Sequence, residues 1–493
     1  MVVTQPDRDT EERADVCIVG SGAAGSVLSW KLLNAGHSVV VLEKGDYYPK
    51  EDLETWDEEN LLRLWKNSGS QLTRNYSVNI AQGECVGGST VINYGICFKT
   101  PESVLDEWTR DYGVSSMTSE DMAPFFDELE TNLHVTEIPS RGKNHEVLRK
   151  GCEGLGYKAS YMRRNCLGCT SKQSMLETYL KWADEKGAKV YANTAIETIL
   201  VRNGKAAGVR GATFDKKTGK KHRISINSSI VILAAGAIAS SEILLKNNLG
   251  NRSGQVGKHL SLHPSPAMIA EFDEEIEGHR DIPMAFACYE FGVLNTKQHG
   301  FTIESVFLPP FQFATVIPGI GLAHKEMMAR YRNYAMAGIL VHDDPVGQIS
   351  LNWSREAVID YGLSDSDKQK VIRGMKEVAK IFFAADARKI ITSHLQETVL
   401  NSEKDLYLID ERGAEAGALL LGSAHPQGGN RMGEDRRKSV VNSFCEAHDV
   451  PNLFVCDASV FPTSIGVNPQ LTVMAIASRT AKHVAENARR YFA

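Results

Sequence analysis

Residues 15–25, Asp15-Val16-Cys17-Ile18-Val19-Gly20-Ser21-Gly22-Ala23-Ala24-Gly25, decide the fold of this chain. An apolar run enters a turn whose three glycines have G-x-G-x-x-G spacing, and the residues from Ala23 to Ala35 then favour a helix. Glycines allow a tight turn and a close approach of the backbone to a pyrophosphate, which the positive start of the helix attracts. The stretch therefore predicts a dinucleotide-binding strand–turn–helix unit.

A second strand and an acidic residue complete this unit. Val39 to Leu42 predict a buried parallel strand, and Glu43 follows it, 23 residues beyond Gly20. A carboxylate in this window accepts hydrogen bonds from the adenosine ribose hydroxyls, and it would repel a 2′-phosphate. The residues predicted to contact the dinucleotide here are Gly20, Gly22, Ala23, Ala24, Gly25, Glu43 and Lys44.

Length and composition limit the domain organisation, the partners and the location that we expect for the protein. A chain of 493 residues exceeds a single core and predicts two domains, and a net charge of −6 gives no reason to expect nucleic-acid binding. Nine scattered cysteines are typical of reduced thiols. Residues 1–14 lack a signal peptide's apolar core, and no apolar run approaches the roughly 20 residues of a membrane helix. We expect a cytoplasmic protein without an integral membrane segment.

The sequence predicts two interleaved domains, because segments with the pattern of the nucleotide-binding domain recur three times after residue 45. Ser228 to Gly236 predict a buried strand that rejoins the first sheet, Asn203-Gly204 predict a hairpin turn, and Ser364 precedes an amphipathic helix from Asp365. The predicted dinucleotide-binding domain comprises residues 10–45, 81–100, 187–262 and 420–493. The predicted substrate or cap domain comprises residues 46–80, 101–186 and 263–419.

Three further stretches carry a family resemblance. They are Gly87-Gly88-Ser89-Thr90-Val91-Ile92-Asn93, Gly236-Ala237-Ile238-Ala239-Ser240-Ser241-Glu242-Ile243-Leu244-Leu245, and Cys456-Asp457-Ala458-Ser459-Val460-Phe461-Pro462-Thr463 with Asn468-Pro469-Gln470-Leu471-Thr472. In these the chain resembles the glucose–methanol–choline (GMC) family of flavin oxidoreductases from end to end. Residues 172–174, 344–347 and 423–429 are most similar to its long-chain alcohol oxidase and cholesterol oxidase members.

The resemblance implies an α/β fold with FAD as cofactor. It implies a Rossmann-type FAD-binding domain interleaved with an α+β substrate domain on a mostly antiparallel sheet. No histidine stands in the Gly-Gly-Ser loop where some relatives attach the flavin, so non-covalent FAD is expected. The additional residues expected to contact FAD are Gly87, Gly88, Ser89, Asn93, Ile196, Ala235, Gly236, Asp457, Ala458, Asn468, Pro469 and Gln470.

Alcohol oxidation requires a group that takes the hydroxyl proton while hydride leaves for flavin N5. His425, in Ser423-Ala424-His425-Pro426, is the expected base, because imidazole accepts protons near neutrality. Asn468 is expected to orient the same oxygen through its amide. The family resemblance places this His–Asn pair at the catalytic positions. A closing helix from about Leu471 to Val484 would favour the anionic reduced flavin with its positive start.

Several alternatives stay open at this stage. The substrate is an apolar or amphipathic alcohol, a sterol or a sugar, and the electron acceptor is oxygen, a quinone or a redox protein. Phe307, Phe311 and Phe313 favour an apolar pocket, although ordinary core packing explains them equally well. A sugar or polyol dehydrogenase with a non-oxygen acceptor, or a redox-silent lyase on the same scaffold, is the alternative function.

Weaker candidates are interpreted as structural. His263 resembles a family position at the return into the substrate domain, and Glu304 on a predicted strand is expected to be solvated instead of lying in the pocket. Cys166 and Cys169 cannot complete a four-ligand metal site alone, and we predict no metal. A turn-stabilising or regulatory thiol pair is the preferred interpretation.

Overall fold

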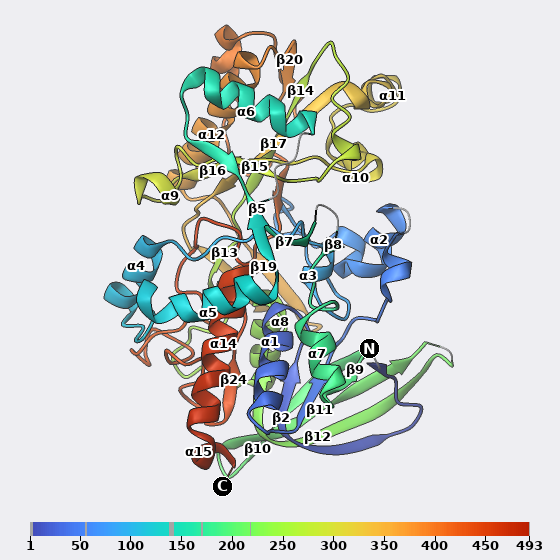
Figure 1. Ribbon diagram of the computed structural model, residues 1–493, viewed down its shortest axis with the longest axis vertical. Helices are drawn as coiled ribbons and strands as arrows, with labels where there is room; N and C mark the ends of the chain where they lie inside the picture. Colours follow the sequence, from blue (N-terminus) through green and yellow to red (C-terminus); the bar gives the residue numbers. More distant parts are fainter. Residues whose placement is uncertain (1–2, 55–56, 138–141, 169–170, 217, 493) are drawn as a thin grey trace.

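The computed structural model describes residues 3–54, 57–137, 142–168, 171–216 and 218–492. Its elements form two main sheets at opposite ends of the long axis (Figure 1). The lower sheet has the order β1 (Val3–Thr4), β9 (Lys189–Tyr191), β3 (Val39–Leu42), β2 (Thr10–Val19), β12 (Lys220–Leu233), β11 (Lys205–Asp215) and β10 (Thr194–Arg202), with β24 (Leu453–Val455) beside the end of β12. All its pairs are parallel except β10–β11 and β11–β12.

The predicted hairpin turn is confirmed in this sheet. Arg202 pairs with Lys205, so Asn203 and Gly204 form a two-residue turn between β10 and β11. Both turn residues have positive φ, 52° and 75°, as the favoured hairpin turn requires. The predicted strand at residues 39–42 and the helix from Ala23, α1 (Ala23–Asn34), are confirmed as well.

The upper sheet has the order β21 (Val399–Leu400), β20 (Lys389–Ile391), β14 (Ser265–Glu271), β17 (Tyr334–Val341), β16 (Phe301–Ser305), β15 (Phe286–Cys288) and β6 (Ala159–Tyr161). β22 (Leu421–Ser423) extends it from β14, and β4 (Val78–Ile80) pairs with β22. Every pair is antiparallel except β4–β22. The predicted mostly antiparallel substrate sheet is confirmed.

Two small sheets complete the strands. One contains β19 (Ala357–Asp360), β18 (Gly347–Leu351), β13 (Lys258–Ser261) and β23 (Gln427–Gly429). The other contains β5 (Val135–Glu137), β7 (Arg163–Leu167) and β8 (Ser171–Lys172). β13 and β23 are short strands that lie directly before β14 and after β22, and they carry the chain from one lobe to the other.

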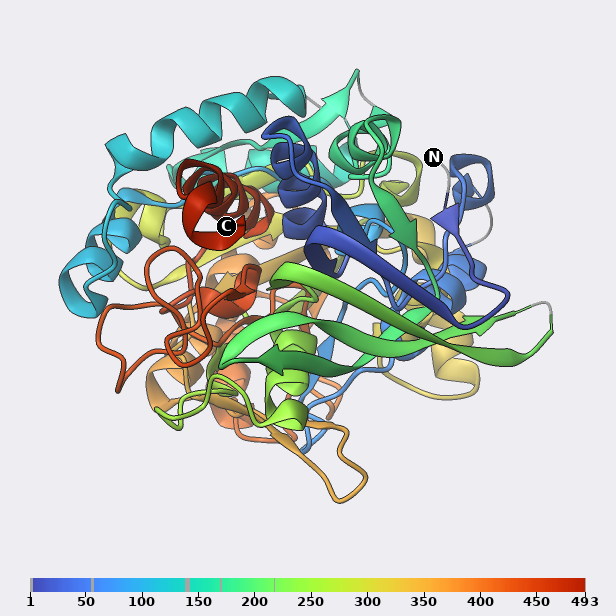
Figure 2. The ribbon, with the colours of Figure 1, turned by 90° about the horizontal axis from the view of Figure 1, so that it is seen from below.

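Helices cover both main sheets. α1 packs against α14 (Gln470–Glu486) and α7 (Tyr179–Glu185), and α5 (Ser119–Asn132) packs against α14; the view in Figure 2 shows α14 nearly end-on beside α1. In the upper lobe, α12 (Asp365–Ala384) packs against α6 (Lys143–Leu155). The remaining helices are α2 (Asp57–Leu64), α3 (Ser89–Ile92), α4 (Glu102–Tyr112), α8 (Ala237–Asn247), α9 (Val293–Thr296), α10 (Pro310–Val316), α11 (Leu322–Ala329), α13 (Tyr407–Arg412) and α15 (Ala488–Phe492).

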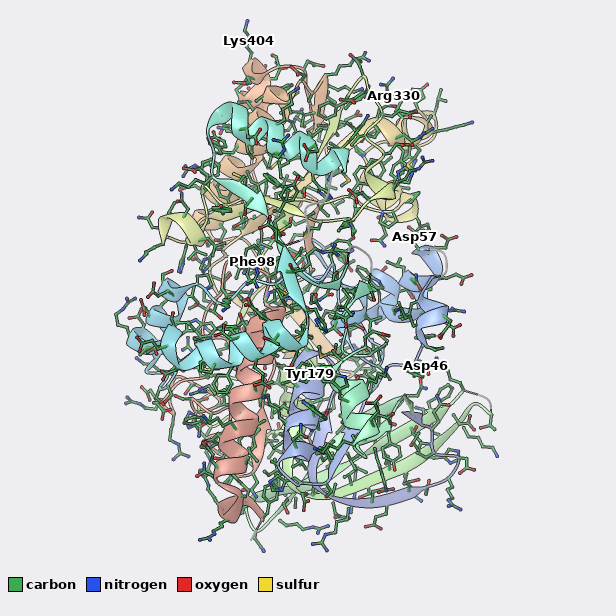
Figure 3. All side chains as sticks on the ribbon, viewed as in Figure 1. Asp46, Asp57, Phe98, Tyr179, Arg330 and Lys404 are labelled. Carbon is green, nitrogen blue, oxygen red and sulfur yellow. The ribbon has the colours of Figure 1, made fainter. Side chains whose placement is uncertain are left out.

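Each lobe has its own apolar core, and some residues contact both. The amphipathic helix predicted from Asp365 is α12, and the apolar residues of its inner face are fully buried against the upper sheet: Val371, Met375, Val378 and Phe382. Phe98, labelled midway along the molecule in Figure 3, packs against the lower core and against a small cluster that includes Met162. The lobes are therefore joined through packed side chains and not through a single linker.

One predicted helix begins later than expected. The sequence favours a helix from Ser174 to Lys186, whereas α7 begins at Tyr179. The preceding backbone is held by tertiary hydrogen bonds, from Gln173 N to Asn165 O and from Met175 N to Thr90 Oγ1. The first bond fastens the segment to β7 and the second to the glycine-rich loop at residues 87–93, so tertiary contacts override the local helix preference.

Candidate active site

The predicted dinucleotide residues meet at one edge of the lower sheet. Gly20 follows β2, Glu43 follows β3, Ala235 follows β12 and Asp457 follows β24. These strands are parallel, so their carboxyl ends share the edge at which doubly wound sheets bind ligands. α1 begins there at Ala23, and its N-cap residue, Gly22, makes no side-chain cap hydrogen bond. The backbone N–H groups of its first turn can therefore bind an anion.

The two glycine loops touch each other at this edge. Gly88 has a φ of 56°, and a Cβ there would lie 2.8 Å from the Cα of Gly22. Gly87 N donates to Ser21 Oγ over 3.0 Å, and Ser21 donates through its backbone N and its Oγ to the Glu43 carboxylate at 2.9 and 2.7 Å. The loops at residues 20–25 and 87–93 therefore form one unit through Ser21.

The glycine positions fit a bound dinucleotide. A Cβ on Gly25 would overlap the Gly20 carbonyl oxygen, so only glycine permits this close turn. Glu43 is buried, and desolvation raises the pKa of its carboxyl group. Hydrogen bonds from Gly45 and Ser21 lower the same pKa and offset part of this rise. The predicted contact residues that are partly exposed, and so line accessible space, include Gly22, Ala23, Gly88, Asn93, Ile196, Ala235, Gly236, Ala458, Pro469 and Gln470.

Hydrogen bonds connect the remaining predicted cofactor residues across the chain. Asn93 Nδ2 donates to Gln470 Oε1 over 2.8 Å, which joins the second glycine loop to the start of α14. Asp457 accepts from Gly236 N over 2.9 Å, and its burial raises its pKa. The other placements are as follows: Ala24 is buried in α1, Ser89 Oγ accepts from Gly83 N, and exposed Lys44 donates to Glu84.

His425 and Asn468, the predicted catalytic pair, lie next to each other. His425 Nε2 is 3.5 Å from Asn468 Nδ2, with His425 half-buried after β22 and Asn468 two residues before α14. Desolvation lowers the pKa of His425 to about 4, so the imidazole is neutral at pH 7. Asn468 precedes Gln470 by two residues, and Gln470 bonds Asn93 of the predicted flavin loop.

His263 belongs to this cluster. Its Nδ1 lies 3.2 Å from His425 Nδ1, and its ring is nearly perpendicular to that of His425, at 89°. Gln427 Nε2 and Gly466 N approach its Nε2 at 2.9 and 3.1 Å. The sequence-based interpretation of His263 as structural is incomplete, because its ring contacts the predicted base directly.

Glu304 corrects a second expectation. It was expected to be solvated, but it lies buried on β16 with only 4% of its surface exposed. Desolvation raises its pKa to about 7, and the Asn468 amide opposes this rise through a hydrogen bond. Within the described chain, Glu304 Oε1 and Asn468 Oδ1 have no hydrogen-bond partner. The cluster therefore contains a buried carboxylate with an oxygen left for a ligand, and the sequence signal for it was one acid in an apolar strand.

The phenylalanines considered for an apolar pocket have different surroundings. Phe307 and Phe313 are buried in a small core with Tyr331 and Tyr334, so core packing explains them, whereas Phe311 is exposed on α10. Cys166 is buried on β7, and Cys169 lies outside the described residues. Among the described side chains, no three His, Cys, Asp or Glu residues group as metal ligands, and no described helix is long and apolar enough to cross a membrane.

Comparisons with known proteins identify the family of the chain. Family models described as GMC oxidoreductase match residues 14–265 and 343–477. An uncharacterized GMC-type oxidoreductase of Mycobacterium tuberculosis is 28% identical over 97% of this chain and 77% of its own length. A long-chain-alcohol oxidase of Arabidopsis thaliana is 28% identical over 97% of this chain and 69% of its own length.

Solved structures agree in fold. A formate oxidase of Aspergillus oryzae RIB40 superposes with a TM-score of 0.74 at 15% identity, covering 98% of this chain and 100% of its own. A pyridoxine 4-oxidase from Mesorbium loti superposes with a TM-score of 0.73 at 16% identity, covering 96% of this chain and 99% of its own. The likeness thus spans both lobes.

Proposed function

We propose that this chain, which belongs to the GMC oxidoreductase family, uses non-covalent FAD to oxidise an alcohol to an aldehyde or ketone. The observation that carries the proposal is the position of the His425–Asn468 pair. Asn468 lies two residues before Gln470, which bonds Asn93, and His425 lies beside Asn468; this supports a place for a substrate hydroxyl next to the loop expected to hold the flavin. The glycine turn and Glu43 suit the adenosine end of the same cofactor.

When bound, FAD supplies the hydride acceptor, and an electron acceptor (oxygen, a quinone or a redox protein) must reoxidise it. The residues of this chain handle the hydroxyl. Asn468 and His425 orient its oxygen, and a base takes its proton while the carbinol C–H leaves as hydride. His425, predicted from the sequence, and Glu304, buried beside Asn468, are the two groups able to take that proton.

We propose an apolar or amphipathic alcohol as substrate. Support comes from relatives named long-chain-alcohol oxidases, one of which is 30% identical over 94% of this chain and 67% of its own length. Phe311 offers an apolar surface as well. Its backbone N on α10 donates to Asp57 of α2 over 3.2 Å, and its ring is exposed beside residues 46–80 of the predicted cap domain.

An anaerobic absorbance titration of the FAD-loaded protein tests the proposal. Primary alcohols of increasing chain length should bleach the oxidised-flavin band, with sterols and sugars as competing classes. Admitting oxygen then separates an oxidase from a dehydrogenase. The variant Asn468→Leu should lose most of the bleaching rate per bound FAD. If native protein binds FAD and no alcohol bleaches it, the redox proposal fails and a lyase is favoured.

A further inference from the structure

The two ring nitrogens of His263 have partners of different kinds. Gly466 N–H points at Nε2 from 3.1 Å, and a backbone amide can only donate. Gln427 Nε2 approaches the same atom at 2.9 Å. The orientation of the Gln427 amide is fixed independently, because Ile465 N donates to its Oε1 over 3.2 Å. His263 Nε2 therefore accepts and carries no proton.

A neutral imidazole without a proton on Nε2 carries it on Nδ1. His263 is neutral, since burial and the neighbouring His425 and His342 hold its pKa well below the usual range. Its Nδ1–H points at His425 Nδ1 from 3.2 Å, so that atom of His425 must accept. The opposite arrangement would set an Nε2–H of His263 against the Gly466 N–H, two donors facing each other.

We infer that His263 is a positioning residue that fixes the tautomer of His425, with the proton on Nε2, the nitrogen 3.5 Å from Asn468 Nδ2. The inference rests on the proposed function and refines it. His425 then meets the substrate oxygen as a hydrogen-bond donor and not as the base. Asn468 Nδ2 is a second donor at the same place. The two nitrogens are 3.5 Å apart, beyond the usual hydrogen-bond length, so neither donates to the other and both can stabilise the charge that develops on the substrate oxygen.

The hydroxyl proton then needs another acceptor. Glu304 is the buried carboxylate beside Asn468, and its Oε1 has no hydrogen-bond partner within the described chain. In the balanced step, the O–H bond breaks and its proton binds the Glu304 carboxylate. The C–H bond breaks and its electron pair leaves with hydrogen as hydride to the bound flavin, and the carbon–oxygen bond becomes a carbonyl.

The backbone around His263 is built to hold this ring in place. His263 has a φ of 48°, in the left-handed region that is unfavourable for a residue with a side chain. The buried Asp343 carboxylate accepts from Leu262 N and His263 N at 2.8 and 3.2 Å, and from Tyr361 Oη at 2.7 Å. Strain that is held by three hydrogen bonds beside a reactive pair is typical of a functional constraint.

Nitrogen NMR of the full-length FAD-loaded protein, labelled with ¹⁵N-histidine, tests the tautomer directly. The variant His425→Gln assigns the His425 signals by their loss. We expect a protonated Nε2 and an unprotonated Nδ1 on His425, and the reverse on His263. A His425 that carries its proton on Nδ1 would overturn the inference while leaving alcohol oxidation intact, whereas native protein that no alcohol reduces would sink the proposed function instead.

Two variants test the positioning role. His263→Asn places an amide N–H close to the former Nδ1 and should keep the tautomer and most of the rate of flavin reduction. His263→Leu removes the donor and should slow flavin reduction about 10-fold or more at saturating alcohol, as loss of a tautomer-setting partner does. FAD content should match the native protein in both. Equal rates for Leu and Asn variants, with the His425 signals unchanged, would contradict the positioning role.

Discussion

The cofactor edge and the catalytic cluster of this molecule are assembled in different ways. At the cofactor edge, one continuous stretch supplies the strand, the glycine turn and the helix, and its partners follow buried strands at the same edge. In the catalytic cluster, His263, Glu304, His425 and Asn468 come from four segments that meet only in the fold. The spacing of glycines in the sequence specifies the cofactor edge, whereas tertiary contacts bring together the side chains of the catalytic cluster.

Removing the Glu304 carboxylate should have the largest effect. We expect Glu304→Gln to slow flavin reduction by about 10²–10⁴-fold, the range for loss of a general base, with FAD content unchanged. Anaerobic stopped-flow absorbance measures the rate. The matched control is Thr302→Val, a buried substitution two residues earlier on β16 and on the same side of the strand. A rate for Glu304→Gln within twofold of that control would assign proton transfer elsewhere.

The same carboxylate should make stability depend on pH. Burial raises the folded-state pKa of Glu304 from 4.5 to about 7, so the folded protein keeps a proton that the unfolded chain releases. The associated stability is complete below about pH 4.5 and is lost as pH rises through 7, amounting to roughly 3 kcal/mol.

Urea unfolding of native protein and Glu304→Gln at pH 5 and pH 8 isolates this contribution. The native protein should lose more free energy of unfolding than the variant over this interval. Asp343, whose pKa is raised to about 6 by burial, is present in both proteins, so its own contribution cancels. Parallel losses in the two proteins would show that Glu304 is ionised throughout the interval.

The cofactor edge responds differently, through affinity for FAD. Gly88→Ala would place a Cβ 2.8 Å from the Cα of Gly22 at a φ of 56°. Such overpacking costs about 1–3 kcal/mol, which corresponds to about 5- to 150-fold weaker binding of FAD. Flavin fluorescence measures the affinity. Gly219→Ala is the control, since it has a φ of 71° but no atom within 4 Å of the added Cβ.

How much the sequence predicts follows the same division. The unit from Gly20 to Glu43, the hairpin at Asn203-Gly204 and the capped helix from Asp365 follow local rules and are confirmed in the structure. The burial of Glu304 and the ring contact of His263 depend on which strand faces which segment, and no local pattern encodes that. Likewise, α7 begins late because Thr90, far away in the sequence, binds the backbone of Met175.

The smallest effect should come from the link between the two glycine loops. Ser21→Ala removes the Oγ that accepts from Gly87 N and donates to Glu43, while the backbone N of Ser21 still donates to Glu43. Two hydrogen bonds are lost, and the one that links the loops, from Gly87 N, is worth about 1 kcal/mol, so we expect roughly fivefold weaker FAD binding. Ser29→Ala is the matched control, because this equally buried serine bonds only within α1, to Ser26 O. If both variants bind FAD like the native protein, the other contacts of the second loop are enough to hold it in place, and the Ser21 hydroxyl contributes nothing to FAD binding. If only Ser21→Ala binds FAD more weakly, the cofactor edge also depends on a side-chain contact that the glycine spacing does not predict.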